Sequence, residues 1–327
     1  MCFQPSLINL PSVVITKLLG VADFRSILVL QKVCSGFRNF IEDICPETHL
    51  KSISITFSLD FIYISMDPFL DWSIDVEYRK QENGCSVQYG MNKEHFRMNH
   101  DLLNIFLNDF QVNLKNQKEN LELLRISFEF FLEGFLLGIK EVLESRESAL
   151  KVRELEFEVK NQEEVMSVLP YVGSKSLNKI SISSPDYLVD LEMDQIVQLE
   201  QWRNVKELEM FNCVVSEPLT SFSHFRRSKL CVQSISSEDL FMLKEAFLAS
   251  PNFESSTIKY KLFEENIFLT QLFGDPVIQG RDSWAFPYED SDQSIQLTHF
   301  SNQTFCFSRV KSCLISKFCD KLDKNYC

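Results

Sequence analysis

Histidine and cysteine are the residues of this chain best suited to bind a metal ion, and cysteine can also act as a nucleophile. His95 and His100 are five residues apart, a spacing that does not put two ligands on one face of a helix. The ten cysteines include no C-x-x-C pair. Four of them, six to eight residues apart near the C-terminus, would form a zinc site only if the fold assembled them: Cys306, Cys313, Cys319 and Cys327. We therefore predict no metal site and no cofactor.

Motifs that bind phosphate or activate a nucleophile are missing from the sequence. It contains no G-x-x-x-x-G-K-S/T, G-x-G-x-x-G, H-E-x-x-H or G-x-S-x-G, and its nine glycines leave little material for a phosphate-binding loop. Glu154, Glu156 and Glu158 would lie on one face of a strand, which indicates a solvated edge or a docking patch. A general acid and a general base need two environments that separate their pKa values, and this pattern gives no sign of them. We predict no catalytic residue and a protein that is not an enzyme on its own.

Composition and charge exclude some classes of partner. The chain has 327 residues, of which 45% are hydrophobic, enough for a substantial core and about two domains. Lys and Arg total 33 against 46 Asp and Glu, and because the first 50 residues are balanced, the whole net charge of −13 lies beyond them. A nucleic-acid binder needs clustered cations to displace counterions from phosphate, so polynucleotides and anionic membranes are disfavoured as partners.

The amino terminus does not resemble a secretory signal. It has no positively charged region before its apolar stretch, which is interrupted by Pro5 and Pro11. No run of 18 apolar residues indicates a membrane span. The cysteines are therefore expected to stay reduced, and we predict a cytoplasmic or nuclear protein.

Residues 10–44 carry the pattern of three short amphipathic helices. Pro11 suits the first turn of a helix that stops near Gly20, Asp23 can cap the second helix, and Pro46 follows the third. Apolar residues recur at helical spacing: Ile15, Leu18, Leu19, Ile27, Leu28, Leu30, Phe37, Phe40, Ile41 and Ile44. About 40 residues rarely fold on their own core, and these apolar residues occupy more faces than three small helices can cover mutually. We infer that another protein covers the surplus.

The pattern changes to alternation between residues 50 and 92. Ile53, Ile55 and Phe57 alternate with polar residues, and Asn83-Gly84 separates two further alternating runs. Asn-Gly between such runs is a strong hairpin signal. We expect a short antiparallel β element here.

From about residue 100 an apolar-x-x-apolar-x-apolar pattern repeats. Its clearest copies start at 121, 152, 177 and 205, about 25 to 31 residues apart and near the spacing of leucine-rich repeats, with degenerate copies near 230 and 258. Helices are expected between the copies, around 131–143, 188–202 and 240–247, the last capped by Ser236 and Asp239. Gly134 and Gly138 in the first of these helices indicate close helix packing. The predicted fold class is α+β or α/β: a small three-helix module, a short antiparallel element, then a leucine-rich-repeat-like βα solenoid.

Such a solenoid would expose the polar positions of its strands on a concave face. The residues at these positions are candidates for binding a target protein: Glu156, Glu158, Ser181, Ser183, Glu209, Phe211, Lys259 and Lys261. The alternative is that they are ordinary solvated strand residues, as most polar surface positions are. Trp202 ends an apolar helical stripe and is expected in the core, whereas Trp284 lies in a Pro-containing stretch and is a better candidate for a contact surface.

The N-terminal residues resemble an F-box. The resemblance rests on Leu10-Pro11, on the segment Asp23 to Leu28, and on Val33-Cys34 followed by Phe37-Arg38. In that family a leucine-proline pair opens the first helix and a V-C-x-x-F-R run lies in a later one. The layout that follows is similar to that of nematode F-box proteins with an FTH domain, up to the W-x-F and F-x-F-x-R-V elements at 284–286 and 305–310.

This resemblance implies a substrate-receptor subunit of an SCF ubiquitin ligase, which binds a Skp-family adaptor held by a cullin. The implied domains are an F-box at 7–48, a linking β element at 50–92, an FTH domain at 100–310 and a cysteine-containing tail at 311–327. Adaptor-binding residues would be Leu10, Pro11, Ile15, Leu18, Leu19, Leu28, Val33 and Cys34. Gly20 and Gly36 depart from the family pattern. The alternative is a repeat-domain scaffold without a role in ubiquitination.

Overall fold

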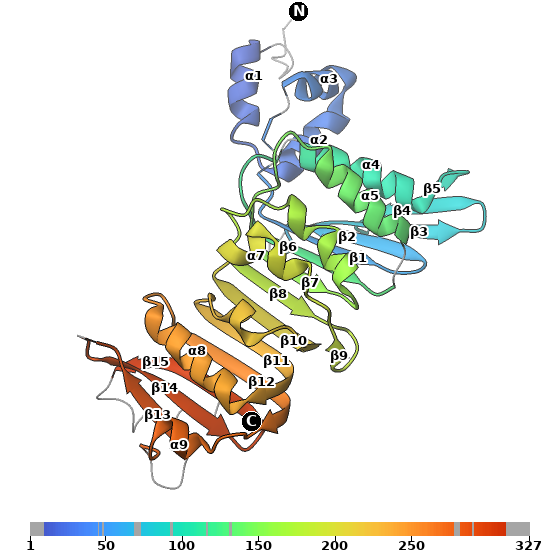
Figure 1. Cartoon of the computed structure of the whole chain (residues 1–327). Coiled ribbons are helices and arrows are strands. Elements are labelled where there is room, and N and C mark those ends of the chain that lie inside the picture. Colours follow the sequence, from blue (N-terminus) through green and yellow to red (C-terminus); the bar gives the residue numbers. More distant parts are fainter. Residues whose placement is uncertain are drawn as a thin grey trace, which may run out of the picture. The chain divides into compact units, whose positions relative to one another are not determined.

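The computed structural model describes residues 10–44, 46–47, 49–68, 73–91, 94–115, 117–130, 133–277, 282–289 and 291–311 (Figure 1). The chain divides into two compact units. The first consists of Met1–Glu156 with Ser167–Leu177, and the second of Phe157–Met166 with Asn178–Cys327. No described helix is long and apolar enough to cross a lipid bilayer.

Three short helices begin the first unit: α1 Ser12–Leu19, α2 Phe24–Val33 and α3 Ser35–Ile44. Asp23 caps α2 as predicted, because its side chain accepts a hydrogen bond of 2.7 Å from the backbone N–H of Ser26. The helices share a small core of their own: Ile15, Leu19, Ile27, Phe37 and Ile41. Asn9, which precedes α1, lies outside the described residues.

A mixed β-sheet forms the rest of the first unit. Its strands are β1 Ser52–Phe57, β2 Phe61–Met66, β3 Ile74–Gln81, β4 Gly84–Tyr89, β5 His95–Met98 and β6 Leu121–Phe128. β1 to β5 pair antiparallel in chain order, while β1 pairs parallel with β6. Helices α4 Leu102–Lys115 and α5 Glu133–Glu144 pack on this part of the chain (Figure 1). Asn83-Gly84 lies at the turn between β3 and β4, where Gly84 has φ +143° and a Cβ atom would collide with the Arg97 carbonyl.

Strand β7, Val152–Glu158, leads from the first unit into the second. The strands of the second unit are β8 Lys179–Ser183, β9 Val189–Asp190, β10 Glu207–Val215, β11 Arg227–Ser236, β12 Ser255–Glu264, β13 Ser283–Pro287, β14 Gln293–Phe300 and β15 Thr304–Lys311. β8, β10, β11 and β12 pair parallel in this order, and β15, β14 and β13 continue it antiparallel.

Four short α-helices are described in the second unit: α6 Gln162–Met166, α7 Glu200–Asn204, α8 Ser237–Ala249 and α9 Leu269–Phe273. Single 3-10 turns occur at Leu169–Tyr171 in the first unit, and at Ile196–Gln198 and Leu219–Phe222 in the second. The capping box predicted for α8 is present, since the Ser236 hydroxyl accepts from the Asp239 N–H and the Asp239 carboxylate accepts from the Ser236 N–H.

The predicted fold class is wrong. The described residues form fifteen strands of mixed β-sheet, and the chain is not a three-helix module followed by a leucine-rich-repeat solenoid. A solenoid needs the same βα unit throughout and parallel strands. β1 to β5 pair antiparallel, as expected for residues 50–92, but β1 also pairs with β6, so this element belongs to the same mixed sheet. After β12 the strands β13 to β15 pair antiparallel as well.

Two smaller expectations also fail. The helix expected at 188–202 is replaced by β9, a 3-10 turn and the start of α7, because Leu188 has φ +53° and β9 pairs with β10. Trp284 is buried rather than presented for contact, and its indole N–H donates to the Gly274 carbonyl at 2.9 Å. Trp202 lies in the core, as predicted.

Gly138 allows α5 to approach α4 closely, as the G-x-x-x-G pattern indicates. A Cβ atom at Gly138 would overlap the side chain of Leu107, whereas one at Gly134 would lie 3.6 Å from Leu103, an ordinary contact. The two glycines therefore differ although they lie on one helix.

Alanine substitutions should separate the two positions. Gly134→Ala is expected to raise the free energy of unfolding by up to about 1 kcal/mol, the helix-propensity gain of alanine over glycine. Gly138→Ala should leave the free energy of unfolding unchanged or lower it by about 1–2 kcal/mol, because Leu107 must move to make room for the new Cβ atom. Chemical denaturation followed by circular dichroism measures both changes. Adding Leu107→Ala to Gly138→Ala should remove the clash, because the side chain that the new Cβ atom meets is then gone. Equal changes in stability for Gly134→Ala and Gly138→Ala would contradict this account.

Candidate functional site

Helix α1 presents apolar side chains on two neighbouring faces. Ile15 and Leu19 point into the core of the three helices and are almost fully buried. Leu18 keeps 44% of its surface exposed and Val13 keeps 65%. Leu10 and Pro11, just before the helix, are exposed as well. The predicted adaptor-binding residues of this segment therefore divide into core residues and residues open to a partner.

The remaining predicted adaptor-binding residues lie on and after α2. Val33 is largely exposed, whereas Leu28 and Cys34 are half-buried. Leu28 lies with Val29 on the wall of a groove, described below, rather than on the surface that α1 presents. Sequence analysis missed the exposed residues Val13 and Val14. The i, i+4 pair of Val14 and Leu18 is the signal that could have found this face.

His49 and Leu50 precede the sheet of the first unit and join it to the three helices through hydrogen bonds. The His49 imidazole contacts the Gly20 carbonyl at 3.2 Å through Nε2 and Glu119 at 3.4 Å through Nδ1. The hydrogen bond between His49 and Glu119, together with the charges of His49 and Lys51, holds the pKa of Glu119 below its usual value. The buried amide of Gln117 exchanges hydrogen bonds with the backbone N–H and carbonyl of Leu50, at 3.1 and 3.0 Å. The end of α1 is thus fastened to the rest of the unit.

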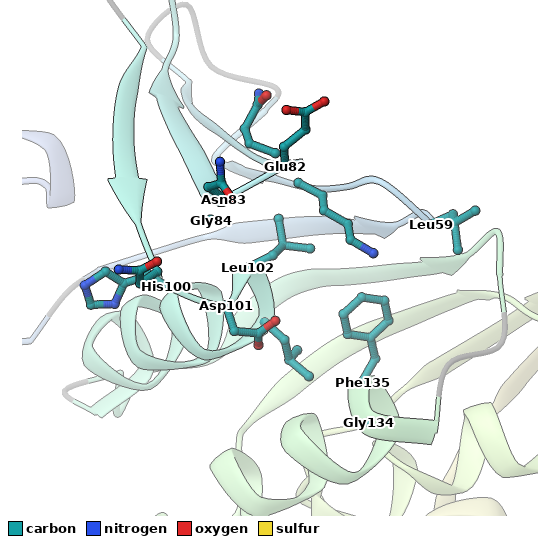
Figure 2. Close-up of a pocket in the computed structure, with 13 residues that line it drawn as sticks. Leu59, Glu82, Asn83, Gly84, His100, Asp101, Leu102, Gly134 and Phe135 are labelled. Carbon is teal, nitrogen blue, oxygen red and sulfur yellow. The ribbon is translucent and has the colours of Figure 1, made fainter.

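A cavity of about 610 Å³ lies between the β3–β4 turn, the start of α4 and the start of α5 (Figure 2). Glu82 and Asn83 come from the turn, Asp101 directly precedes α4, and Phe135 lies in the first turn of α5. The Asp101 carboxylate accepts a hydrogen bond of 3.1 Å from the Asn104 N–H and therefore caps α4. This cavity gathers turn and cap residues around a junction of elements.

Two of the predicted target-binding residues in the second unit, Glu209 and Lys261, form ion pairs with residues of other strands. Glu209 on β10 lies between two lysines, with Lys179 Nζ at 2.6 Å and Lys229 Nζ at 3.4 Å. Partial burial by itself would raise the pKa of Glu209, but the hydrogen bonds and charges of the two lysines outweigh it, so the pKa lies below the usual value. Glu209 is thus an ionised, paired residue.

The other predicted target-binding residues of this unit are arranged as follows. The Ser183 hydroxyl donates to the Phe157 carbonyl at 3.0 Å, and Lys261 pairs with Asp190 at 3.5 Å. Phe211 and Lys259 are exposed, while Ser181 and Glu158 are half-buried. In the first unit, Glu156 pairs with Arg125 at 2.7 Å. Sequence analysis missed the partners Lys179, Lys229 and Arg125, because the strand register that brings them close is not visible in the sequence.

Among the described residues, no three His, Cys, Asp or Glu side chains are arranged to hold a metal ion. Cys306 is buried, and burial raises the pKa of its thiol. Its three neighbours in the tail, Cys313, Cys319 and Cys327, lie outside the described residues, as does the tail after Lys311. His95 and His100 are both exposed.

Comparison with known proteins relates the chain to one family. Residues 133–276 match the FTH domain. F-box A protein 224 of Caenorhabditis elegans is 24% identical over 277 residues, which cover 79% of this chain and 67% of that protein. No solved structure matches the chain. The resemblance to nematode F-box proteins with an FTH domain, inferred from the sequence, is confirmed.

Proposed function

We propose that this relative of the nematode F-box proteins, with its FTH domain, is the substrate receptor of an SCF-type cullin-RING ubiquitin ligase. Its homology supports a non-catalytic, adaptor-like protein. In the proposed complex the N-terminal helices bind a Skp-family adaptor, the adaptor is held by a cullin, and the remaining chain binds a target protein. The complex would act in the cytoplasm or the nucleus.

The observation that carries this proposal is the exposed apolar face of α1. Val13, Val14 and Leu18 remain exposed although the neighbouring face of the same helix, with Ile15 and Leu19, has a core of its own. Apolar surface left open next to a complete small core is what an obligate partner would cover. In a chain related to an F-box protein, a Skp-family adaptor is the partner that fits.

A receptor of this kind accelerates ubiquitin transfer without a nucleophile. It holds the target near the activated ubiquitin, so the effective concentration of the target lysine rises and a bimolecular encounter becomes an intramolecular one. The chemistry then belongs to the other subunits. The proposal therefore needs no catalytic residue in this chain.

Co-purification with a Skp-family adaptor tests the proposal. The full-length tagged protein is co-expressed with the adaptor, as the wild type and as Leu18→Asp. We expect the wild type to retain the adaptor and Leu18→Asp to retain at least about tenfold less, because a charge at the centre of an apolar interface costs more than about 1.4 kcal/mol.

Leu137→Asp is the matched control, since Leu137 is an exposed leucine on another helix of the same unit, α5. It should retain the adaptor like the wild type. Recovery of no adaptor by the wild type, or equal recovery by Leu18→Asp, would overturn the proposal and favour a scaffold without a role in ubiquitination.

A further inference from the structure

A second hollow of the first unit lies between α2 and α4. It is a groove of about 850 Å³, lined by Leu28 and Val29 of α2, Asp109 and Val112 of α4, and residues of β2 to β4. The elements that form it can be followed in Figure 1. Its volume is in the range of ligand-binding sites in proteins.

Two carboxylates line this groove among apolar and a few other polar side chains, and hydroxyl groups rather than cations hold them. Asp109 accepts a hydrogen bond of 2.8 Å from the Tyr78 hydroxyl. Asp75 accepts from Ser65 at 2.6 Å and from Ser73 at 3.1 Å. Within the described part of the chain, neither carboxylate forms an ion pair, and Arg25, the cation of the lining, is exposed on the α2 side.

Asp109 in particular is charged at a cost. Burial raises its pKa above the usual value, and the hydrogen bond from Tyr78 and the charge of Arg97 oppose this only in part. A cation placed beside Asp109 would recover part of the lost solvation energy. In the free protein the groove therefore holds a partly buried negative charge that a bound cation would stabilise.

The rim of the groove is apolar and open. Val29 keeps 54% of its surface exposed and Val112 keeps 65%, and Met91 is fully exposed. An open apolar rim, made by these three residues, suits an extended segment that crosses the groove, because Val29 on α2 and Val112 on α4 offer apolar contacts in the same groove as the two carboxylates.

We propose that this groove binds a peptide segment of a target protein in which a lysine or arginine is flanked by apolar residues. The cation reaches Asp109 and Asp75, and its neighbours cover Val29, Met91 and Val112. That the peptide belongs to a target protein rests on the proposed function, whereas the peptide-binding groove does not depend on it. We infer this occupant from charge complementarity, because the two carboxylates favour a cation and the apolar residues of the rim favour apolar side chains on either side of it.

Selection from a library of random short peptides tests the proposal. The library is displayed on phage and selected on the purified full-length protein, and the enriched peptides are then titrated by fluorescence polarisation. We expect peptides with Lys or Arg between apolar residues. Asp109→Asn, which keeps an acceptor for the Tyr78 hydroxyl, should weaken their binding about tenfold, and so should Val112→Lys.

Two controls match these changes. Asp60→Asn removes the same charge from an exposed position of the first unit, and Asn108→Lys adds the same charge to α4 outside the groove lining. Both should bind the peptides like the wild type. The proposal is overturned if neutral or acidic peptides are selected, or if Asp109→Asn binds the basic peptides as well as Asp60→Asn does. A dimer that dissociates on Val112→Lys would also overturn it, with a second copy as the occupant.

Adaptor recovery separates this inference from the proposed function. Asp109→Asn and Val112→Lys should retain the Skp-family adaptor, while Leu18→Asp should lose the adaptor and keep the peptides. Peptide binding by a protein that never binds an adaptor would leave the groove assigned and remove the ligase role.

Discussion

Replacing Trp202 with alanine should lower the free energy of unfolding of the second unit by about 3–5 kcal/mol, the usual range for a buried tryptophan. Trp202 is 1% exposed. Its ring meets Phe222 and Phe225 edge to face, with centroids 5.8 and 5.0 Å apart. Its indole N–H donates to the Ser221 carbonyl at 3.2 Å. Truncation therefore leaves a large cavity, removes two aromatic contacts and leaves the partly buried Ser221 carbonyl without its hydrogen-bond donor.

Urea denaturation followed by circular dichroism measures this change without relying on tryptophan fluorescence. Trp202→Phe is the control, because it keeps an aromatic ring in the site and loses the indole N–H. Its cost should stay near 1–2 kcal/mol, the order of one lost buried hydrogen bond. A loss below about 1 kcal/mol for Trp202→Ala would show that this cluster does not hold the unit together.

Local signals in the sequence predicted local structure well. The Asp23 cap, the Ser236–Asp239 capping box and the Asn83-Gly84 turn each depend on groups within three residues of one another, so the sequence contains everything needed to form them. The direction in which two strands pair, by contrast, depends on residues that are far apart in the sequence. Alternation around Ile53 or Ile295 shows that a strand forms, but antiparallel and parallel partners require the same alternation. The repeat copies between 121 and 258 fall on β6, β7, β8, β10, β11 and β12, but their spacing could not show that antiparallel strands join both ends of this run in one mixed sheet.

The surface sites depended on tertiary structure in two ways. On α1, Val14 with Leu18 and Ile15 with Leu19 are adjacent i, i+4 pairs, and helical periodicity cannot tell which pair faces the core. On the strand face, Glu209 was predicted only as a candidate for target binding, and its ion pairs could not be predicted because Lys179 and Lys229 are distant in sequence and meet it only through the register of three strands. Exposure and pairing of this kind follow from the fold rather than from residue type.

Alanine at the two adjacent leucines of α1 should have opposite outcomes. Leu19→Ala removes a side chain that is 1% exposed from the core of the three helices, and we expect a loss of about 2–5 kcal/mol. A module of this size has little stability to lose, so its helices should open locally. Leu18→Ala removes an exposed side chain and should change stability by no more than about 0.5 kcal/mol.

Hydrogen exchange of the amides in α1, α2 and α3 measures the two effects without unfolding the rest of the chain. Leu19→Ala should lose most of the protection in these helices, and Leu18→Ala should keep it. If the proposed adaptor contact exists, adding a Skp-family adaptor should restore protection to Leu19→Ala only in part, since a partner that binds the folded helices must also offset the cost of refolding them. Leu18→Ala should show the reverse pattern, with folded helices and weaker adaptor binding. Loss of protection in both variants would place Leu18 in the core and remove the apolar face on which the proposed adaptor contact depends.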